Sequence, residues 1–156
     1  MTNELHTNTD MAGGSALLDD ALIDGDGTLV VDIDGTLCPI KGKEESYADL
    51  VPYSDMVEKL RAYQAKGFNI LLFTARNMNT HKGNLGRINK FTAPVLIEWL
   101  AKWDIPYDEL MFGKPWPQKK GFYIDDRTIR PREFLELNLD EIEALLERDR
   151  LLEHSK

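Results

Sequence analysis

The apolar residues of this 156-residue chain fall into short continuous runs that alternate with helical stripes. The runs are three to six residues long and are rich in β-branched and aromatic side chains, so each predicts a buried strand. They cover residues 29–33, 68–73, 110–112 and 122–124. Runs of this kind are typical of a parallel sheet that is covered by other elements on both faces.

Spacings of three and four between apolar residues predict the first helix in the interval between the first two runs. Ser54 or Asp55 is its expected N-cap, and Gly67 is its expected C-terminal glycine. Its apolar stripe consists of Met56, Val57, Leu60 and Tyr63. Such a stripe faces a core when the helix packs on a sheet.

Two more helices are expected downstream. Thr92 is the expected cap of one of them, with Pro94 in its first turn, and the last helix runs from about Leu139 to Leu152. Strands that alternate with helices predict an α/β fold, here a three-layer α/β/α, Rossmann-like domain with a mainly parallel sheet. We expect residues 1–20 to form a flexible tail and residues 21–156 to form the single domain.

Composition and charge narrow the class of protein. The net charge of −8 argues against a nucleic-acid partner, and no apolar run approaches the roughly 20 residues of a membrane helix. Cys38 is the single cysteine, so no disulfide forms within the chain, and the N-terminus lacks the apolar region of a signal peptide. A cytoplasmic protein is expected. Residues 76–132 nevertheless carry eleven basic and six acidic side chains, which suits either a small anionic substrate or a solvated surface.

The hexapeptide pattern D-x-D-G-T-L occurs twice, at residues 24–29 and 32–37. Ligands of open parallel sheets bind at the carboxyl ends of the strands, so a functional pair of aspartates should follow a strand directly. Asp32 does, whereas Thr28 and Leu29 of the first copy are needed to build that strand. The second copy is therefore the expected site, and the first is a turn that leads into the sheet.

Polar residues follow each of the four expected strands: Asp32 and Asp34, then Thr74, then Lys114, then Asp125 and Asp126. Because the carboxyl ends of parallel strands meet at one edge, these side chains are expected to converge. Two groups of carboxylates suit a hard dication such as Mg2+. A hydroxyl, backbone N–H groups and a lysine suit phosphoryl oxygens.

This order of groups, over roughly residues 29–132, resembles the haloacid-dehalogenase-like (HAD) phosphohydrolase superfamily. Three segments, TARNMNTHKGNLGRINKFT, IPYDELMFGKPW and GFYIDDRTIRP, resemble the small phosphatases encoded with capsular polysaccharide biosynthesis. The resemblance implies a HAD-like, Mg2+-dependent phosphomonoesterase. It would hydrolyse a sugar phosphate or a similar small phosphorylated metabolite through an aspartyl-phosphate intermediate.

The same resemblance implies roles for single residues. Asp32 would be the nucleophile, and Asp34 would protonate the leaving oxygen and then activate water. Thr74, Ala75 and Lys114 would hold the phosphoryl group. The implied metal ligands are Asp32, Asp34 through its backbone carbonyl, Asp125 and Asp126.

Several neighbours of these residues are candidates for contacts with a ligand. Arg76 and Asn77 follow Thr74 directly, and Trp116 lies beside Lys114, so all three are expected to bind substrate. The short interval between Lys114 and Asp125 also leaves Lys119 and Lys120 as alternatives for the phosphate contact.

Neither interval of forty residues, from Asp34 to Thr74 or from Thr74 to Lys114, leaves room for a cap domain. The loop 77–91 or a neighbouring subunit is then expected to cover the site, which makes a homo-oligomer an expectation. Two alternatives stay open: a nucleotide or polynucleotide-end phosphatase, which needs a basic groove with stacking aromatic residues, and a non-catalytic phosphoryl-accepting or binding protein.

Overall fold

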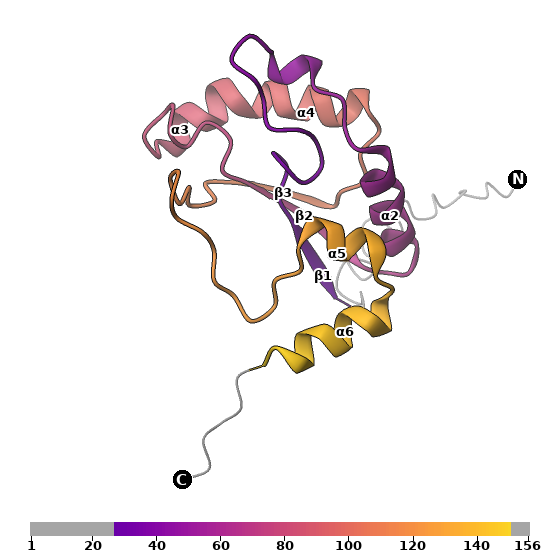
Figure 1. Ribbon diagram of the computed structural model, residues 1–156. Helices are drawn as coiled ribbons and strands as arrows, with labels where there is room; N and C mark the ends of the chain where they lie inside the picture. Colours follow the sequence, from indigo (N-terminus) through magenta and orange to yellow (C-terminus); the bar gives the residue numbers. More distant parts are fainter. Residues whose placement is uncertain (1–26, 151–156) are drawn as a thin grey trace, which may run out of the picture.

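The computed structural model describes residues 27–150, which form an α/β domain built on one three-stranded sheet (Figure 1). The strands are β1 (Thr28–Val31), β2 (Asn69–Thr74) and β3 (Glu109–Phe112), in the order β1-β2-β3. Both pairings are parallel. The expected tail of residues 1–20, and the two aspartates at 24 and 26, lie outside the described residues.

The register places the polar groups of the three strands at one edge of the sheet. Val31 pairs with Leu72, and Thr74 pairs with Phe112, so β2 and β3 extend beyond β1 toward that edge. Thr28 and Leu29 lie in β1, as predicted from the need for a strand directly before Asp32. Because the strands are parallel, all three carboxyl ends open on the same side.

Helix α2 (Ser54–Ala65) ends as predicted but begins differently. Its last turn closes with two hydrogen bonds, from Gly67 N–H to the Gln64 carbonyl at 3.0 Å and from Phe68 N–H to the Tyr63 carbonyl at 3.2 Å. Gly67 has φ +94, a conformation that favours glycine. The predicted stripe, Met56, Val57, Leu60 and Tyr63, is buried.

The predicted side-chain cap of α2 is wrong. Tyr53 occupies the N-cap position without a side-chain hydrogen bond to the helix, and Ser54 is already helical. The Asp55 carboxylate accepts a hydrogen bond at 2.8 Å from the N–H of Met56 inside the first turn. The Asp55 carboxylate takes the place of a side-chain cap, because it accepts from one of the N–H groups that have no partner within the first turn of a helix.

The prediction for the second helix is confirmed in part: α4 starts directly after Thr92 with Pro94 in its first turn, but Thr92 makes no side-chain cap and the helical run begins upstream of it. Three consecutive segments continue one another: α3 (Leu85–Arg87), the π-helical turn η2 (Ile88–Thr92) and α4 (Ala93–Lys102). The true cap is Asn84, whose side chain accepts from Arg87 N–H at 3.1 Å. Thr92 is buried within the helical run and its hydroxyl donates to Asn77 at 3.0 Å instead. Insertion of a π-turn is a common device near functional sites.

One hydrophobic core joins the sheet to α2, α4 and the 3-10 turn η1 (Tyr47–Asp49). The core-facing side chains of the strands belong to the same cluster as Leu60 of α2 and Trp99 of α4. Trp99 also donates its indole N–H to the Leu50 carbonyl at 2.7 Å. On the opposite face of the sheet Val30 and Met111 are 63% and 49% exposed, so α2 and α4 cover the same face.

The fourth predicted strand, 122–124, does not form. Phe122 and Ile124 are 76% and 88% exposed, and the segment follows the loop that contains Pro115 and Pro117. A run of three residues buries little apolar surface, and the sheet face beside it carries no helical layer in the described residues. The prediction of a fourth strand is therefore wrong.

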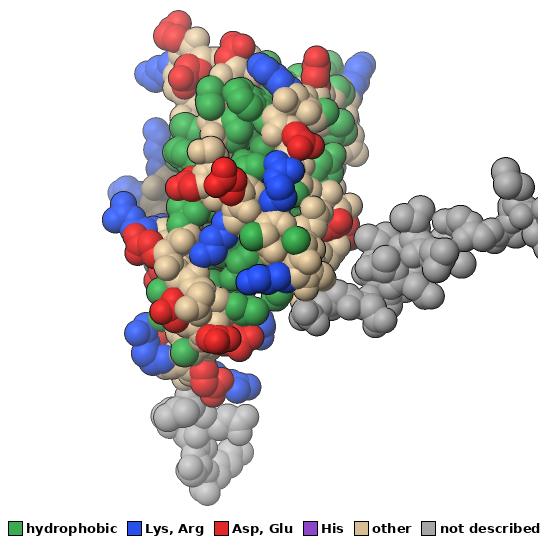
Figure 2. Space-filling model, turned by 90° about the vertical axis from the view of Figure 1, so that its right-hand side faces the viewer, with side chains coloured by type: hydrophobic (Ala, Val, Ile, Leu, Met, Phe, Trp, Pro, Cys, Tyr) green, Lys and Arg blue, Asp and Glu red, His purple; other side chains and the backbone are tan. Residues whose placement is uncertain are grey.

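Two short helices complete the described chain, α5 (Pro131–Glu136) and α6 (Leu139–Arg148). The first was not anticipated, and it packs on α2, where Phe134 and Tyr63 lie with ring centroids 5.1 Å apart. The second ends at Arg148, before the expected Leu152. On the face of the molecule that lies to the right in Figure 1, acidic and basic side chains are interspersed (Figure 2).

The fold class is the predicted one, an α/β Rossmann-like domain with a parallel sheet and no cap domain. The expected third layer is not found within residues 27–150, because Val30 and Met111, on the face opposite α2 and α4, are exposed. From residue 27 to residue 150, no helix is long and apolar enough to cross a membrane.

Candidate active site

A tight turn after β1 presents Asp32 and Asp34 at the carboxyl edge of the sheet. The Ile33 carbonyl accepts from the N–H groups of Thr36, Leu37 and Cys38 at 3.1, 2.8 and 3.2 Å. Ile33, Leu37 and Cys38 are fully buried, so the turn is anchored in the core. The two carboxylates flank the buried Ile33 and are only partly exposed, at 31% for the Asp32 side chain and 23% for that of Asp34.

Asp32 is held by a cation from the turn that follows the third strand. Lys114 Nζ lies 3.0 Å from Asp32 Oδ1, and the Thr36 hydroxyl donates to Oδ2 at 3.2 Å. The backbone N–H of Lys114 donates to the Thr74 carbonyl at 3.1 Å, which continues the pairing of β2 and β3 past the ends of the strands. Gly113 has φ +85, and a β-carbon there would lie 2.8 Å from the Leu85 side chain. The positive φ therefore favours glycine where the chain turns to deliver Lys114.

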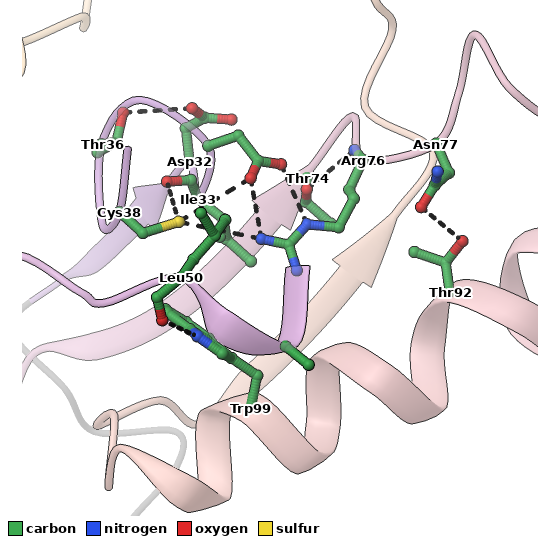
Figure 3. A network of polar contacts seen from close by, with 12 residues as sticks. Asp32, Ile33, Thr36, Cys38, Leu50, Thr74, Arg76, Asn77, Thr92 and Trp99 are labelled. Atoms are coloured by element: carbon green, nitrogen blue, oxygen red, sulfur yellow. Dashed lines mark hydrogen bonds and ion pairs between the residues drawn. The ribbon is translucent and has the colours of Figure 1, made fainter. Parts of the chain in front are cut away.

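Asp34 is bound by Arg76, the second residue after β2. Arg76 Nε lies 3.1 Å from Asp34 Oδ2, and Nη2 lies 2.9 Å from Oδ1 (Figure 3). The side chain of Arg76 is 1% exposed and that of Asp34 is 23% exposed. This differs from the expectation that Arg76 contacts substrate, because its guanidinium is buried and directed to the carboxylate.

Thr74 and Asn77 shape the loop after β2. Thr74 is buried, and its hydroxyl oxygen accepts from the Arg76 N–H at 3.0 Å. Asn77 has φ +60, and its side-chain oxygen accepts from the Thr92 hydroxyl. Asn77 therefore links the loop after β2 to the π-helical turn η2. This link fixes the position of the loop backbone near Ala75.

Cys38 is a structural neighbour of the carboxylates. Burial, and next the Asp34 carboxylate, raises the pKa of its thiol to about 11. A thiol of that kind stays protonated at neutral pH, so it is not a nucleophile there. Burial and the Asp34 charge also raise the pKa of Tyr47, and burial and the Asp32 charge raise the pKa of Tyr123.

Trp116 lies in the loop after Lys114 and is 41% exposed. With Met78, Asn79, Lys82 and Gln118 it lines an open hollow of about 410 Å³. The walls of this hollow are thus contributed by the loops that follow Thr74 and Lys114. Asp32, Thr74 and Lys114 do not line this hollow, so the expected contact of Trp116 with substrate stays a prediction.

Of the three candidate lysines, the structure brings Lys114 to the aspartates. Lys119 and Lys120 are exposed and line a neighbouring hollow with Trp116. Between residues 27 and 150, the one cation in an ion pair with Asp32 is Lys114.

The structure does not bring Asp125 and Asp126 to Asp32 and Asp34. Both are exposed, and the Asp125 carboxylate accepts from the Arg127 N–H at 2.8 Å within its own turn. The described part of the chain contains no group of three acidic, histidine or cysteine side chains that could hold a metal ion. The expected four-residue metal set is thus not assembled. Asp125 and Asp126 directly follow residues 122–124, where the predicted fourth strand does not form.

Two contacts of this site lie beyond what the sequence analysis anticipated. The first is the ion pair of Arg76 with Asp34, and the second is the ring of Tyr47 under that guanidinium, 4.2 Å from the ring centroid. Thr36 carries a signal in the sequence, because it belongs to the D-x-D-G-T pattern. Tyr47 carries none, since it comes from the connection between β1 and α2.

Comparison with protein-family models and with curated proteins gives no match. Among solved structures, the chain is similar to a structural-genomics target from Vibrio cholerae, with 48% identity and a TM-score of 0.76. The alignment covers 80% of this chain and 99% of the Vibrio cholerae chain. This chain belongs to the same family as the Vibrio cholerae protein.

Weaker similarity extends to two structures of a Pnkp1/Rnl/Hen1 complex, one of which is described as an RNA repair complex. Their identities are 20% and 21%, with a TM-score of 0.42 for both. The alignments cover 62% and 72% of this chain, and 30% and 35% of the other chains. Similarity at this level carries no inference about function.

Proposed function

We propose that this protein is a phosphoric monoester hydrolase that acts on a small phosphorylated metabolite. The observation that carries the proposal is the position of Lys114 against Asp32, with Asp34 two residues away on the same turn. A carboxylate that faces outward beside a lysine and a second carboxylate has the parts needed for attack on phosphorus. The resemblance to the HAD superfamily assigns the same residues.

The first step transfers the phosphoryl group to the protein. An oxygen of the Asp32 carboxylate attacks phosphorus and forms an acyl-phosphate bond, while the bond between phosphorus and the ester oxygen breaks. The leaving oxygen takes its proton from the Asp34 carboxyl group. The alcohol departs, and an aspartyl phosphate remains.

The second step returns the protein to its starting state. Asp34, now a carboxylate, accepts a proton from a water molecule as that water attacks phosphorus. The bond between Asp32 and phosphorus breaks, inorganic phosphate leaves, and Asp34 carries the proton for the next cycle.

Cations are required because a phosphate and a carboxylate repel each other. Lys114 lies beside Asp32 and supplies one positive charge where charge builds up on the transferring oxygens. The backbone N–H groups around Ala75 are the proposed neutral donors, and Thr74, which is 1% exposed, stays in the proposal as the residue whose hydroxyl fixes that loop through the Arg76 N–H. All of them lie at the carboxyl ends of β1, β2 and β3, or just after them.

Mg2+ is part of the proposal on the chemistry of the donors and on the resemblance. Asp32, the Asp34 carbonyl, Asp125 and Asp126 offer oxygen ligands of the kind that Mg2+ prefers, and the ion would supply further positive charge. Asp125 and Asp126 can join the other two only if the exposed segment 121–127 moves toward β1. The two steps above are therefore written for the residues of the chain alone.

The proposed substrate is a sugar phosphate or a similar metabolite. The proposed role in surface polysaccharide biosynthesis rests on the resemblance to capsule-associated phosphatases. The hollow lined by Trp116 and Lys82 offers an apolar ring and a positive charge to the alcohol part of such a compound. In the absence of a cap domain, a second copy of the chain is the proposed cover. The mass in solution, measured by light scattering, tests that assembly.

The test is release of inorganic phosphate by the full chain from p-nitrophenyl phosphate and from a panel of sugar, polyol, nucleotide and 5′-phosphorylated oligonucleotide substrates. Asp32→Asn should remove activity, and Asp24→Asn, in the other copy of the motif, should retain it. Unchanged turnover in Asp32→Asn would overturn the assignment of the nucleophile. A preference for the oligonucleotide would replace the metabolite as substrate class.

A further inference from the structure

We propose that Arg76 is the positioning residue for Asp34, an inference that rests on the proposed function and adds a residue to it. Two donors of one guanidinium meet the two oxygens of one carboxylate, at 3.1 and 2.9 Å. A paired contact of this kind sets both the place and the plane of the carboxylate, which a single hydrogen bond does not. Proton transfer depends on that placement, because the donor must lie within hydrogen-bond reach of the leaving oxygen.

Arg76 is itself held from several sides. Its guanidinium carbon lies 4.2 Å from the centroid of the Tyr47 ring and 6.0 Å from that of Trp99. Its backbone N–H donates to the hydroxyl of Thr74. A side chain locked by packing and by a hydrogen-bonded backbone is a rigid support for a reacting group.

The charges favour a functional pair over a structural one. Within the described residues, Asp34 is the one carboxylate in an ion pair with Arg76, and the buried Nη1 atom has no hydrogen-bond partner. A buried guanidinium with an unsatisfied N–H is costly, and an apolar side chain of similar volume would fill the space at lower free energy. The cost of the buried Arg76–Asp34 pair is explained if the reaction needs the Asp34 carboxylate in a fixed position.

The pair leaves Asp34 able to react. A carboxylate offers about four lone-pair positions, and the guanidinium occupies one on each oxygen. Of the two side chains, only Asp34 is accessible to solvent to a notable extent: it is 23% exposed, whereas Arg76 is 1% exposed. Arg76 therefore acts through Asp34 and stays out of reach of the substrate.

The test uses the leaving group to separate positioning from general damage. Arg76→Lys keeps the charge but cannot span both oxygens. For this variant and the wild type, kcat/KM is measured on glycerol phosphate, whose alkoxide needs a proton, and on p-nitrophenyl phosphate, whose phenolate leaves without one. We expect a loss of about 100-fold on the alkyl ester and of less than about tenfold on the aryl ester.

Lys59→Met is the matched control. Lys59 of α2 also donates two hydrogen bonds, to the carbonyls of Leu135 and Leu137, and within the described residues it forms no ion pair or hydrogen bond with Asp32 or Asp34. Its loss should lower the melting temperature and leave the ratio of the two kcat/KM values as in the wild type. Tyr47→Leu, which removes the ring under the guanidinium, should shift that ratio in the direction of Arg76→Lys and serves if the latter does not fold.

The two kcat/KM ratios decide between a positioning role for Arg76 and a purely structural one. Equal losses on both esters, or no loss, overturn the positioning role while the proposed function stands. If Arg76→Lys does not fold, an unchanged ratio in Tyr47→Leu overturns it as well. A wild type that releases phosphate from neither ester overturns the proposed function, and this inference falls with it.

Discussion

Lys114 Nζ lies 3.0 Å from Asp32 Oδ1 although 82 positions separate the two residues in the chain. The contact exists because β1 and β3 are parallel to β2 and end at the same edge, and because Gly113 allows the turn that follows β3. It joins the proposed nucleophile to the cation that would offset the charge of a phosphate.

Replacement of Lys114 should affect the reaction far more than replacement of its neighbours. We expect Lys114→Met to lower kcat/KM by about 100-fold or more, because it removes a charge placed against the reacting carboxylate. Lys119→Met and Lys120→Met should each change it by less than about tenfold, since both side chains are exposed. A larger loss from Lys119→Met or Lys120→Met would transfer the phosphate contact to that lysine.

Asp34→Asn should destabilise the fold, because it leaves the buried Arg76 guanidinium without a counter-charge. The expected cost is about 3 kcal/mol in the free energy of unfolding, measured by urea titration. Asp34→Asn combined with Arg76→Met should recover part of that loss.

Asp104→Asn is the matched control for that measurement. Asp104 also pairs with an arginine, Arg61, but its side chain is 91% exposed, so its loss should cost less than about 1 kcal/mol. Equal costs for the two variants would contradict the burial of the Arg76 pair.

Magnesium dependence follows from the proposed ligands. Removal of divalent ions with EDTA should abolish phosphate release, and added Mg2+ should restore it. Asp125→Asn should raise the Mg2+ concentration needed for half-maximal activity by about tenfold or more, because a charged ligand is lost. Asp140→Asn, an exposed acid of α6, is the control. Full activity in EDTA would remove the ion from the proposal.

Cys38 should be inert in the folded protein. The raised pKa, about 11, leaves the thiol protonated at pH 8, and the side chain is fully buried. Iodoacetamide at pH 8 should therefore label the urea-unfolded chain much faster than the folded one. Similar rates in the two states would contradict the position of Cys38.

The same shift has a consequence for stability at high pH. The unfolded thiol loses its proton near its ordinary value of 9.0, before the folded one does, so the folded state loses stability as pH rises from about 9 to about 11. Cys38→Ala should remove up to about 3 kcal/mol of that decline. The difference between the variant and the wild type, followed by urea titration across this range, isolates Cys38 from the tyrosines.

Gly67→Ala should destabilise the protein through the backbone alone. Gly67 has φ +94, and an added β-carbon would meet no atom within 4 Å, so the cost is that of the left-handed conformation, about 1 kcal/mol. Gly86→Ala, in the helical segment α3, should instead be neutral or stabilising. Opposite signs for the two variants are expected in thermal unfolding.

Much of the fold could be predicted from local patterns. The apolar runs at 29–33 and 68–73 and the stripe from Met56 to Tyr63 identify β1, β2 and α2, because burial repeats with the period of each element. The positions of Asp32, Thr74 and Lys114 after strands also follow from the chain order. Helix caps were less predictable, since Ser54 and Thr92 lie inside helices where other groups satisfy the backbone.

The sequence by itself determined the positions of β1, β2, β3 and α2 and the polar residues that follow the three strands. Only the tertiary structure decided which of those residues meet. Arg76 turns inward to Asp34 because Tyr47 and Trp99, from distant segments, form the space that holds it. The run 122–124 stays outside the sheet although its pattern matches that of a strand. A local pattern records how a segment divides its apolar and polar sides, whereas pairing depends on the partner that folding places beside it.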